Sequence, residues 1–375
     1  MMADTKSILY QPIEIGNMVV KNRLARSATA ECMATSEGAV SERLLQLYEA
    51  LAEGGAGLII TGLAYVQPNG QSVTNQIGID RDDLVSGLRR LTESVRKNGD
   101  DCKIAVQIAH GGRQGTSSFG DPVAPSAVYE PMMRNMPREM TLDEIEETIE
   151  AFSEGARRAM EAGFDAVQLH AAHGYLLSEF LSPYTNRRTD EYGGSFEKRI
   201  RIVLEIYRRI VKNLGGDFPV LIKMNVEDFV KGGLKIDESK KLAEKFSKVG
   251  FSAIETSGGM WESPKHYKEI RGFPPEARIG IRSRDQEAYF LPYAREIKEV
   301  IGVPLMLVGG IRSFDVAEKI VEDGDSDLIS MCRPLIREPD LPNKWSSGTS
   351  ATADCISCNR CVMSLSKGVS CHQNK

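Results

Sequence analysis

Two histidines and a tyrosine lie within six residues of one another, as His170, His173 and Tyr175. This spacing could serve two metal ligands, two hydrogen-bond donors to a substrate oxygen, or two structural histidines. Metal ligands at this spacing usually need a third protein ligand, and no carboxylate lies immediately beside the pair. Tyr175 adds a phenolic O–H that can act as a general acid. We therefore predict a reactive site here, with Lys223 across its mouth.

Four of the seven cysteines lie close together near the end of the sequence, as Cys355, Cys358, Cys361 and Cys371. Three cysteines at two-residue spacing and a distant fourth fit a 4Fe–4S cluster. A tetrahedral zinc site is the alternative, because Cys₄ zinc sites also use C-x-x-C units. His372 could replace one cysteine in either site. Four unliganded thiols would be open to oxidation, so we predict a metal-binding segment.

A glycine pair and an arginine follow the last two strand-like runs and could bind a phosphate group. Gly309 and Gly310 would let backbone N–H groups approach the phosphate closely, and Arg333 offers a planar fork for its oxygens. The alternative is a Gly-Gly turn and a surface arginine, and the local sequence favours neither. Further candidate residues at strand ends are Ser27, Ala28, Thr29, Gln107, Lys223 and Cys332.

Strand-like runs that alternate with helical patterns position these residues. Most runs have apolar residues at consecutive positions, as in strands buried on both faces. The helical segments have apolar residues at spacings of three and four, as in 196–213 and 286–300. A third segment, 141–162, begins with the capping box Thr141 to Glu144. The strand-like runs are 22–27, 58–62, 103–109, 166–170, 220–225, 253–257, 304–309 and 327–332.

Eight alternations of this kind predict a (β/α)8 TIM barrel in the α/β class. A doubly wound sheet is the competing arrangement, but it would carry a Gly-x-Gly-x-x-Gly turn after its first strand. No such turn follows residues 22–27. The connections 64–80 and 111–140 exceed the usual loop length, and each follows a strand. We interpret them as binding loops on the C-terminal face of the barrel.

Composition limits the class of protein further. The 375 residues are 41% hydrophobic and 26% charged, which is typical of a globular chain. The formal charge of −5 argues against a nucleic-acid partner, which would require a basic face. No apolar run approaches the ~20 residues of a membrane span. Residues 1–12 lack a basic-then-apolar signal pattern, so we expect a cytoplasmic protein. We divide the chain into a barrel, 1–345, and a cysteine-rich tail, 346–375.

At these motifs the sequence resembles the Old Yellow Enzyme family of FMN-dependent ene-reductases. Within that family it is similar to the branch of 2,4-dienoyl-CoA reductase, in which a cysteine cluster follows the barrel. The stretches that carry the resemblance occur in the family's order. They are PIEIG at 12–16 with KNRL at 21–24, VQIAHGGR at 106–113, HAAHGY at 170–175 continuing through EFLSP at 179–183 to NRRTDEYGGS at 186–195, and SMCRP at 330–334.

The resemblance implies an FMN site at the barrel mouth. The residues it implies for that site are Ser27, Ala28, Thr29, Gly62, Gln107, Lys223, Gly309, Gly310, Cys332 and Arg333. Gln107 would bond the pyrimidine edge, and Lys223 would place positive charge beside it. The family usually has arginine where Lys223 stands, and lysine keeps the charge but loses the fork. Cys332 replaces a small residue, and the tail cysteines are spaced slightly more closely than in the relatives.

The resemblance also implies a reaction. His170 and His173 would donate hydrogen bonds to the carbonyl oxygen of an α,β-unsaturated compound, either an enone or an enoyl thioester. Tyr175 would protonate the α-carbon after hydride transfer from the reduced flavin, with NAD(P)H as the reductant. Two alternatives remain: a flavin dehydrogenase of the trimethylamine dehydrogenase type, and an electron-transfer subunit of a larger redox complex. A redox partner protein at the cysteine tail and a homo-oligomer are further expectations.

Overall fold

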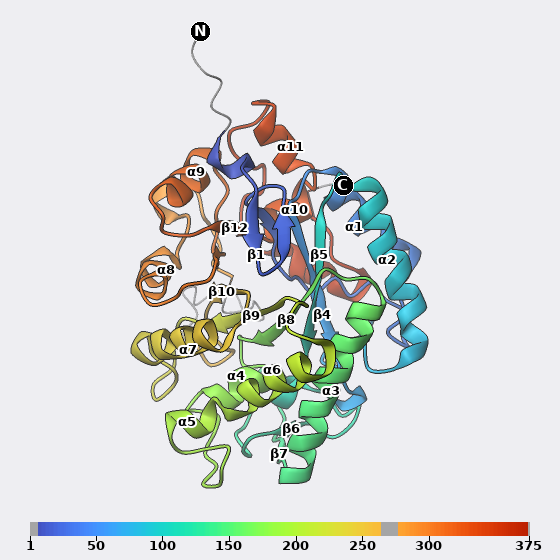
Figure 1. The fold of residues 1–375 in the computed structure, drawn as a ribbon, viewed down its shortest axis with the longest axis vertical. Coiled ribbons are helices and arrows are strands. Elements are labelled where there is room, and N and C mark those ends of the chain that lie inside the picture. The colour runs from blue at the N-terminus through green and yellow to red at the C-terminus, as the bar shows by residue number, and fades with distance from the viewer. Residues whose placement is uncertain (1–6, 264–276, 374–375) are drawn as a thin grey trace.

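The computed structural model describes residues 7–263 and 277–373, and eight parallel strands of this part close into a barrel. The predicted (β/α)8 fold is therefore confirmed. Helices form a layer around the barrel (Figure 1). In order around the barrel the strands are β3 (Leu24–Arg26), β4 (Leu58–Tyr65), β5 (Lys103–Ala109), β8 (Ala166–Ala171), β9 (Val220–Asn225), β10 (Ala253–Ser257), β11 (Leu305–Leu307) and β12 (Leu328–Met331).

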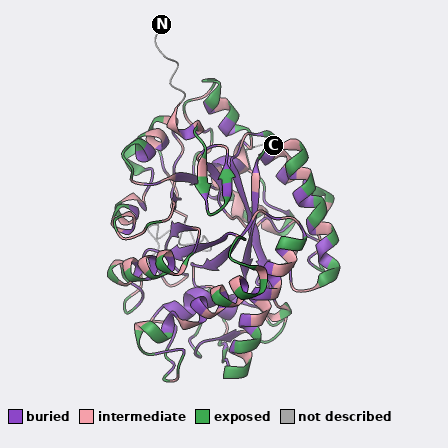
Figure 2. Ribbon diagram, in the orientation of Figure 1, coloured by how far each residue is buried: buried purple, intermediate pink, exposed green. Residues whose placement is uncertain are grey.

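The helices of the outer layer follow the barrel strands in turn. They are α1 (Glu42–Glu53), α2 (Val85–Asn98), α3 (Leu142–Glu161), α6 (Arg201–Leu214), α7 (Ile236–Val249), α8 (Leu291–Lys298), α9 (Phe314–Glu322) and α10 (Arg333–Arg337). Each longer helix buries one stripe of apolar side chains and exposes the opposite face, as the alternating colours of Figure 2 show. The strands inside this layer are almost entirely buried.

The predicted helices are present with altered ends. The capping box of Thr141 and Glu144 is formed at the start of α3. The segment predicted as one helix over 196–213 is divided at Ile200 into α5 (Phe196–Arg199) and α6. The segment 286–300 is helical only as α8, because a 3₁₀ turn precedes it and a proline occupies its first turn, where proline favours helix initiation.

A β-hairpin closes the N-terminal end of the barrel. Strands β1 (Ile13–Ile15) and β2 (Met18–Val20) pair antiparallel, and their buried side chains pack against the interior of the barrel. The interior side chains at this level are all apolar. They include Ala25, Leu58, Ile60, Ala105, Ala166, Leu221, Ala253, Met306 and Leu328. This apolar layer keeps water from reaching Lys223 and Glu255, which lie above it, from the N-terminal end of the barrel.

Alternate side chains of each strand point into the barrel, so the residue two positions after an apolar one lies one layer higher. On β9, Lys223 follows Leu221 in this way, and on β10, Glu255 follows Ala253. The strand register pairs Lys223 with Glu255 directly and Lys223 with His170 on the other side. The upper half of the barrel is therefore polar, and it faces the C-terminal ends of the strands.

The remaining elements lie at the two ends of the barrel. The long connection after β5 contains the two-residue strands β6 (Val123–Ala124) and β7 (Arg138–Glu139), which pair with each other. The short helix α4 (Leu176–Leu181) follows β8. The helix α11 (Leu341–Ser346) precedes the cysteine tail. In the described residues we find no helix long and apolar enough to cross a membrane.

The tail returns to the barrel after α11. Ala351 accepts a backbone hydrogen bond from Phe314 at the start of α9, and Ala353 donates one to Arg312. A 3₁₀ helix then spans Arg360–Lys367, and the amide of Val369 bonds the carbonyl of Glu31, which follows β3. The tail is thus packed on the end of the barrel where β3 and β11 terminate. Its independence as a domain stays a prediction.

Candidate active site

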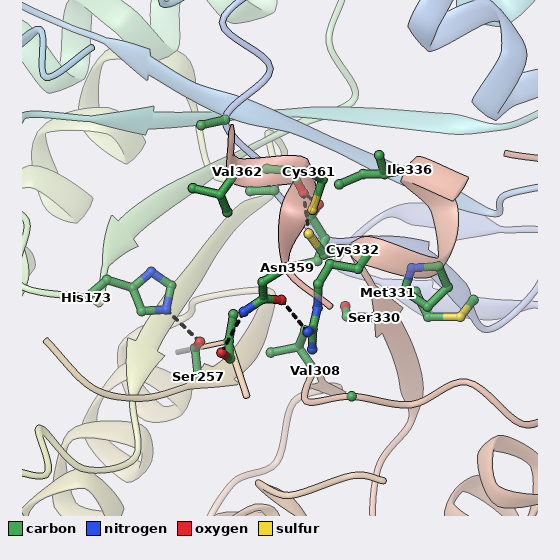
Figure 3. A pocket seen from close by; sticks show the side chains of 18 of the residues that line it. His173, Ser257, Val308, Ser330, Met331, Cys332, Ile336, Asn359, Cys361 and Val362 are labelled. Atoms are coloured by element: carbon green, nitrogen blue, oxygen red, sulfur yellow. Dashed lines mark hydrogen bonds between the residues drawn. The ribbon is translucent and has the colours of Figure 1, made fainter. Parts of the chain in front are cut away.

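A cavity opens at the C-terminal ends of the barrel strands, where barrel enzymes place their active sites. It brings together the three predicted catalytic residues and eight of the ten predicted cofactor residues. These are His170, His173, Tyr175, Ser27, Ala28, Thr29, Gln107, Lys223, Gly310, Cys332 and Arg333. The tail forms another part of the wall. Figure 3 shows Asn359, Cys361 and Val362 of the tail across the same space from His173 and Ser257.

The other two predicted cofactor residues, Gly62 and Gly309, are not among the residues that line the cavity. The amide of Gly62 donates a hydrogen bond of 2.6 Å to the buried carboxylate of Glu31. A Cβ at Gly62 would come within 2.0 Å of that carboxylate, so the close approach requires glycine. The strand register shifts between Ile60 and Leu63, and Leu63 reaches the cavity instead.

His170, His173 and Tyr175 form a compact group in one wall of the cavity. The two imidazole rings lie 5.2 Å apart in an edge-to-face arrangement, and the rings of His170 and Tyr175 lie 4.7 Å apart. Nε2 of His173 is 2.6 Å from the hydroxyl of Ser257. Nδ1 of His170 is buried without a hydrogen-bond partner in the described residues. Such an unsatisfied atom costs stability unless a ligand or water fills the site.

Both histidines are neutral in this environment. Burial lowers the pKa of His170 to about 3, and the nearby charge of Lys223 acts in the same direction. Burial likewise holds the pKa of His173 well below its usual value, with smaller contributions from His170 and Lys223. A low-dielectric site disfavours the charged form of an imidazole. Each ring therefore carries one N–H donor and one acceptor nitrogen near neutral pH.

The backbone of His173 is held in an unusual conformation. Its φ angle is +64°, in the left-handed region that non-glycine residues seldom adopt. The side chain of Asn225 accepts a hydrogen bond of 3.0 Å from the His173 amide. The side chain of Gln114 donates one of 2.7 Å to the His173 carbonyl oxygen. With the contact to Ser257, these bonds fix the imidazole over the cavity.

A connected polar network forms the floor of the cavity and the layer directly beneath it. Nζ of Lys223 donates to the hydroxyl of Ser27 at 2.8 Å and lies 3.3 Å from the carboxylate of Glu255. Ser27 in turn donates to Glu255 at 2.7 Å. Gln168 donates to Glu255 at 2.9 Å and accepts from Gln107 at 2.7 Å. All five residues are buried.

Sequence reasoning missed Gln168 and Glu255, although a signal for them exists. Gln168 precedes His170 by two positions on β8, so both side chains point into the barrel. Glu255 precedes Ser257 by two positions on β10 in the same way. A polar residue at an inward position of a buried strand is uncommon, and it marks the polar half of a barrel interior.

Arg333, predicted to bind phosphate, lies at the opposite end of the cavity. Its Nη1 donates to the backbone carbonyl of Arg278 at 2.7 Å and to the side chain of Asn359 at 2.5 Å. Asn359 also donates to the carbonyl of Ala277 at 2.9 Å. This residue of the tail therefore connects Arg333, at the start of α10, with the segment that begins at Ala277 (Figure 3). Nearby, the hydroxyl of Thr29 contacts the thiol of Cys332 at 3.0 Å.

The four tail cysteines are unpaired thiols in the structure. Burial raises the pKa of Cys361 to about 12, and the thiols of Cys332, Cys355 and Cys358 act in the same direction. Cys332 and Cys361 line the same cavity. Among residues 7–263 and 277–373, however, no three His, Cys, Asp or Glu side chains are arranged to share one metal ion. The described part of the chain therefore contains no assembled metal centre.

The loop after β5 and the loop after β10 are tied together beside His173. Arg113, which follows β5, is completely buried and forms two hydrogen bonds, of 2.5 and 2.9 Å, with Glu262. Nε1 of Trp261 donates to Gln114 at 3.0 Å. These bonds join the loop predicted over 111–140 to the start of the loop after β10. His266 and Tyr267 of the second loop lie outside the described residues.

Residues 8–351 match the model of the NADH:flavin oxidoreductase / NADH oxidase family. The chain belongs to this family of oxidoreductases. It is 40% identical over 356 residues to an NADH oxidase of Thermoanaerobacter brockii, an alignment that covers 94% of this chain and 52% of that protein. The chain thus spans about half the length of this relative.

Two solved structures of the family are similar to this one. The first, a 2-naphthoyl-CoA reductase in complex with 2-naphthoyl-CoA, has a TM-score of 0.87 at 31% identity, covering 94% of this chain and 54% of that chain. The second, an old yellow enzyme homologue from Zymomonas mobilis, has a TM-score of 0.77 at 27% identity, covering 93% and 95%. The resemblance to the Old Yellow Enzyme family that the motifs predicted is confirmed.

The neutral state of His170 predicts a pH dependence of stability. Below pH 6.5 an imidazole in the unfolded chain takes up a proton, whereas His170 in the folded chain stays neutral down to about pH 3. The unfolded state is thereby favoured as the pH falls, and from pH 7 to pH 5 this removes about 2 kcal/mol of stability. His170→Asn should remove that contribution when unfolding by urea is compared at the two pH values. The same substitution at the exposed His372 is the control. Equal pH dependence in His170→Asn and the parent protein would contradict a neutral His170.

Proposed function

We propose that this chain binds FMN and reduces the electron-poor C=C bond of an α,β-unsaturated carbonyl compound, with NAD(P)H as the reductant. The main support for the proposal is that the predicted catalytic residues and most of the predicted cofactor residues line one cavity. Two neutral imidazoles and a phenol line one wall, and an ammonium group and an amide lie at the floor. Reduction of a conjugated carbonyl compound requires hydrogen-bond donors for its oxygen and a proton source for its carbon, and this cavity offers both.

The cavity residues fit the parts of FMN. Gln107 and Lys223 at the floor offer an amide and a charge to the polar edge of a pyrimidine ring, and Leu63 offers an apolar surface. Arg333 and Gly310 lie at the other end, where a planar fork and a side-chain-free backbone suit a phosphate group. When bound, FMN would supply a redox-active ring that transfers hydride to carbon. The remaining roles belong to residues of this chain.

His170 and His173 would bind the carbonyl oxygen of the substrate. Both side chains line the cavity, and each neutral ring has an N–H donor to offer. Negative charge grows on this oxygen as the double bond is reduced, and one preorganised donor to such an oxygen is typically worth about 3 kcal/mol. The bonds from Asn225, Gln114 and Ser257 keep His173 in position before the substrate arrives.

Tyr175 would deliver the proton that completes the reduction. Its ring lies against His170, at 4.7 Å between centroids, and it lines the same cavity. A phenol is a weak acid that remains protonated at neutral pH and can protonate a strongly basic carbon. The likeness to a 2-naphthoyl-CoA reductase supports an unsaturated thioester as one substrate class, beside simple enones.

We also propose that Cys355, Cys358, Cys361 and Cys371 bind a metal, either a 4Fe–4S cluster or zinc. Support comes from the spacing of the cysteines. The four sulfur atoms would have to move together on binding, as is common for sites that assemble around their metal. A redox partner that docks at this tail stays a prediction.

Stepwise anaerobic mixing tests the proposed function. The FMN-loaded protein should lose its visible flavin absorbance on addition of NADH or NADPH and regain it on addition of cyclohexenone. A flavin dehydrogenase would instead be bleached by its amine or alcohol substrate. An electron carrier would be reoxidised by an artificial acceptor but not by the enone. A preparation that does not bind FMN would refute the proposal.

Tyr175→Phe separates the two halves of the reaction. Because the phenol acts only on the substrate, reduction of the flavin by NADH should proceed at the parent rate. Reoxidation by the enone should slow by about 10²-fold or more, the usual contribution of a general acid. Both rates are measured by stopped-flow absorbance. Tyr207→Phe, which alters a ring packed on Phe251, is the control. Unchanged reoxidation in Tyr175→Phe would remove this residue from the mechanism.

Elemental analysis tests the proposed metal centre. Protein purified without oxygen should contain about four iron and four acid-labile sulfide per chain if the centre is a 4Fe–4S cluster, or about one zinc if it is a zinc site. Cys358→Ser should lower that content, whereas Cys102→Ser, at a buried cysteine far from the tail in sequence, should not. Absence of all three elements from the parent protein would refute metal binding.

A further inference from the structure

Glu255 is a completely buried carboxylate beneath the cavity, in contact with the lining residues Ser27 and Lys223, and the proposed reaction does not use it. It stands on β10, in direct register with Lys223 on β9. Its oxygens accept hydrogen bonds from Ser27 and Gln168, and the ammonium of Lys223 lies 3.3 Å away. Every one of these partners is also buried, so the carboxylate interacts with protein groups and not with bulk water.

The first consequence concerns charge. A buried carboxylate or a buried ammonium is unstable alone and is retained only when it is paired and hydrogen-bonded. Lys223 and Glu255 satisfy that condition for each other, and the pair is neutral overall. The cavity floor therefore does not carry the full positive charge that Lys223 alone would give it. Removal of Glu255 would leave that charge unbalanced.

The second consequence concerns the direction of the hydrogen bonds. A carboxylate only accepts, so Gln168 must turn its amide NH₂ toward Glu255. The carbonyl oxygen of Gln168 then accepts from the NH₂ group of Gln107. Gln107 also lines the cavity, and its carbonyl oxygen is the acceptor that it can present there. The carboxylate of Glu255 thus fixes the orientation of the side-chain amides of Gln168 and Gln107.

We propose that Glu255 is a positioning residue for the flavin, which balances the charge of Lys223 and, through Gln168, fixes Gln107 as a hydrogen-bond acceptor. The inference rests on the proposed binding of FMN. The pyrimidine edge of a flavin has an N–H group flanked by carbonyl oxygens. An acceptor at Gln107 beside a donor at Lys223 is complementary to that edge. By balancing the positive charge of Lys223, Glu255 also lowers the reduction potential of the flavin. The reduced ring carries more negative charge than the oxidised ring, so it loses more stabilisation when the nearby positive charge is balanced.

Glu255→Gln tests this inference in the FMN-loaded protein. The unbalanced Lys223 should raise the midpoint potential of the flavin, measured by dye-coupled reduction. It should also strengthen the binding of sulfite, which adds to the oxidised ring and leaves it more negative. We expect the Kd for sulfite to fall about tenfold, which corresponds to about 30 mV for a two-electron couple. A potential and a sulfite Kd equal to those of the parent would overturn the proposal.

Two further variants make the test specific. Asp190→Asn breaks the ion pair of the buried Arg188, and neither residue lines the cavity. This variant should therefore leave the midpoint potential of the flavin and the Kd for sulfite unchanged. Lys223→Gln should weaken sulfite binding about tenfold, while the double variant Lys223→Gln/Glu255→Gln should return it to within about threefold of the parent. If Glu255→Gln alone does not fold, the double variant decides, because it leaves neither charge unpaired. If sulfite binding in the double variant is about tenfold weaker than in the parent, Glu255 has no effect on the flavin.

The same measurements separate this inference from the proposed function. If the parent protein does not bind FMN, the proposed function fails before any variant is compared. If the parent binds FMN and reacts with the enone, but Glu255→Gln has the potential and sulfite affinity of the parent, only the role of Glu255 fails.

Discussion

The buried ion pair of Lys223 and Glu255 is the interaction on which the active-site architecture depends. Neither charge would be stable at the floor of the barrel without the other, and the register of β9 and β10 places them side by side. A shift of one residue in that register would turn one of the two side chains to the outer face of the barrel and separate the charges. The pair therefore constrains the barrel as well as the cavity. The polarity of Gln168 and Gln107 follows from the same carboxylate.

The layers below and above this pair have different functions. The β1–β2 hairpin and the apolar interior residues close the barrel from below, so the polar network rests on a dry base. Above it, His170 and His173 are held as neutral rings because burial and the charge of Lys223 both oppose their protonation. The ammonium group thus has two effects at once, since it adds charge to the floor and keeps the neighbouring imidazoles uncharged.

The tail is part of the cavity as well as a potential metal-binding segment. Asn359 reaches Arg333, and Cys361 lines the same cavity as His170, His173 and Tyr175. A substitution in the tail would therefore alter the contacts of Arg333, at the end of the cavity that suits a phosphate. Cys332, which follows β12, and Cys361 of the tail line the same cavity. The proposed metal site and the proposed cofactor site are accordingly neighbours on one face of the barrel.

The sequence by itself determined the barrel, the positions of its strands within a few residues, and the group of His170, His173 and Tyr175. These features depend on local patterns: consecutive apolar residues, capping residues, and reactive side chains at strand ends. Only the tertiary structure decided that Glu255 faces Lys223, that Leu63 replaces Gly62 at the cavity wall, and that the tail forms part of that wall. Each of these depends on strand register, a local register shift or a long-range contact, which arise between segments distant in sequence and leave no pattern within either one.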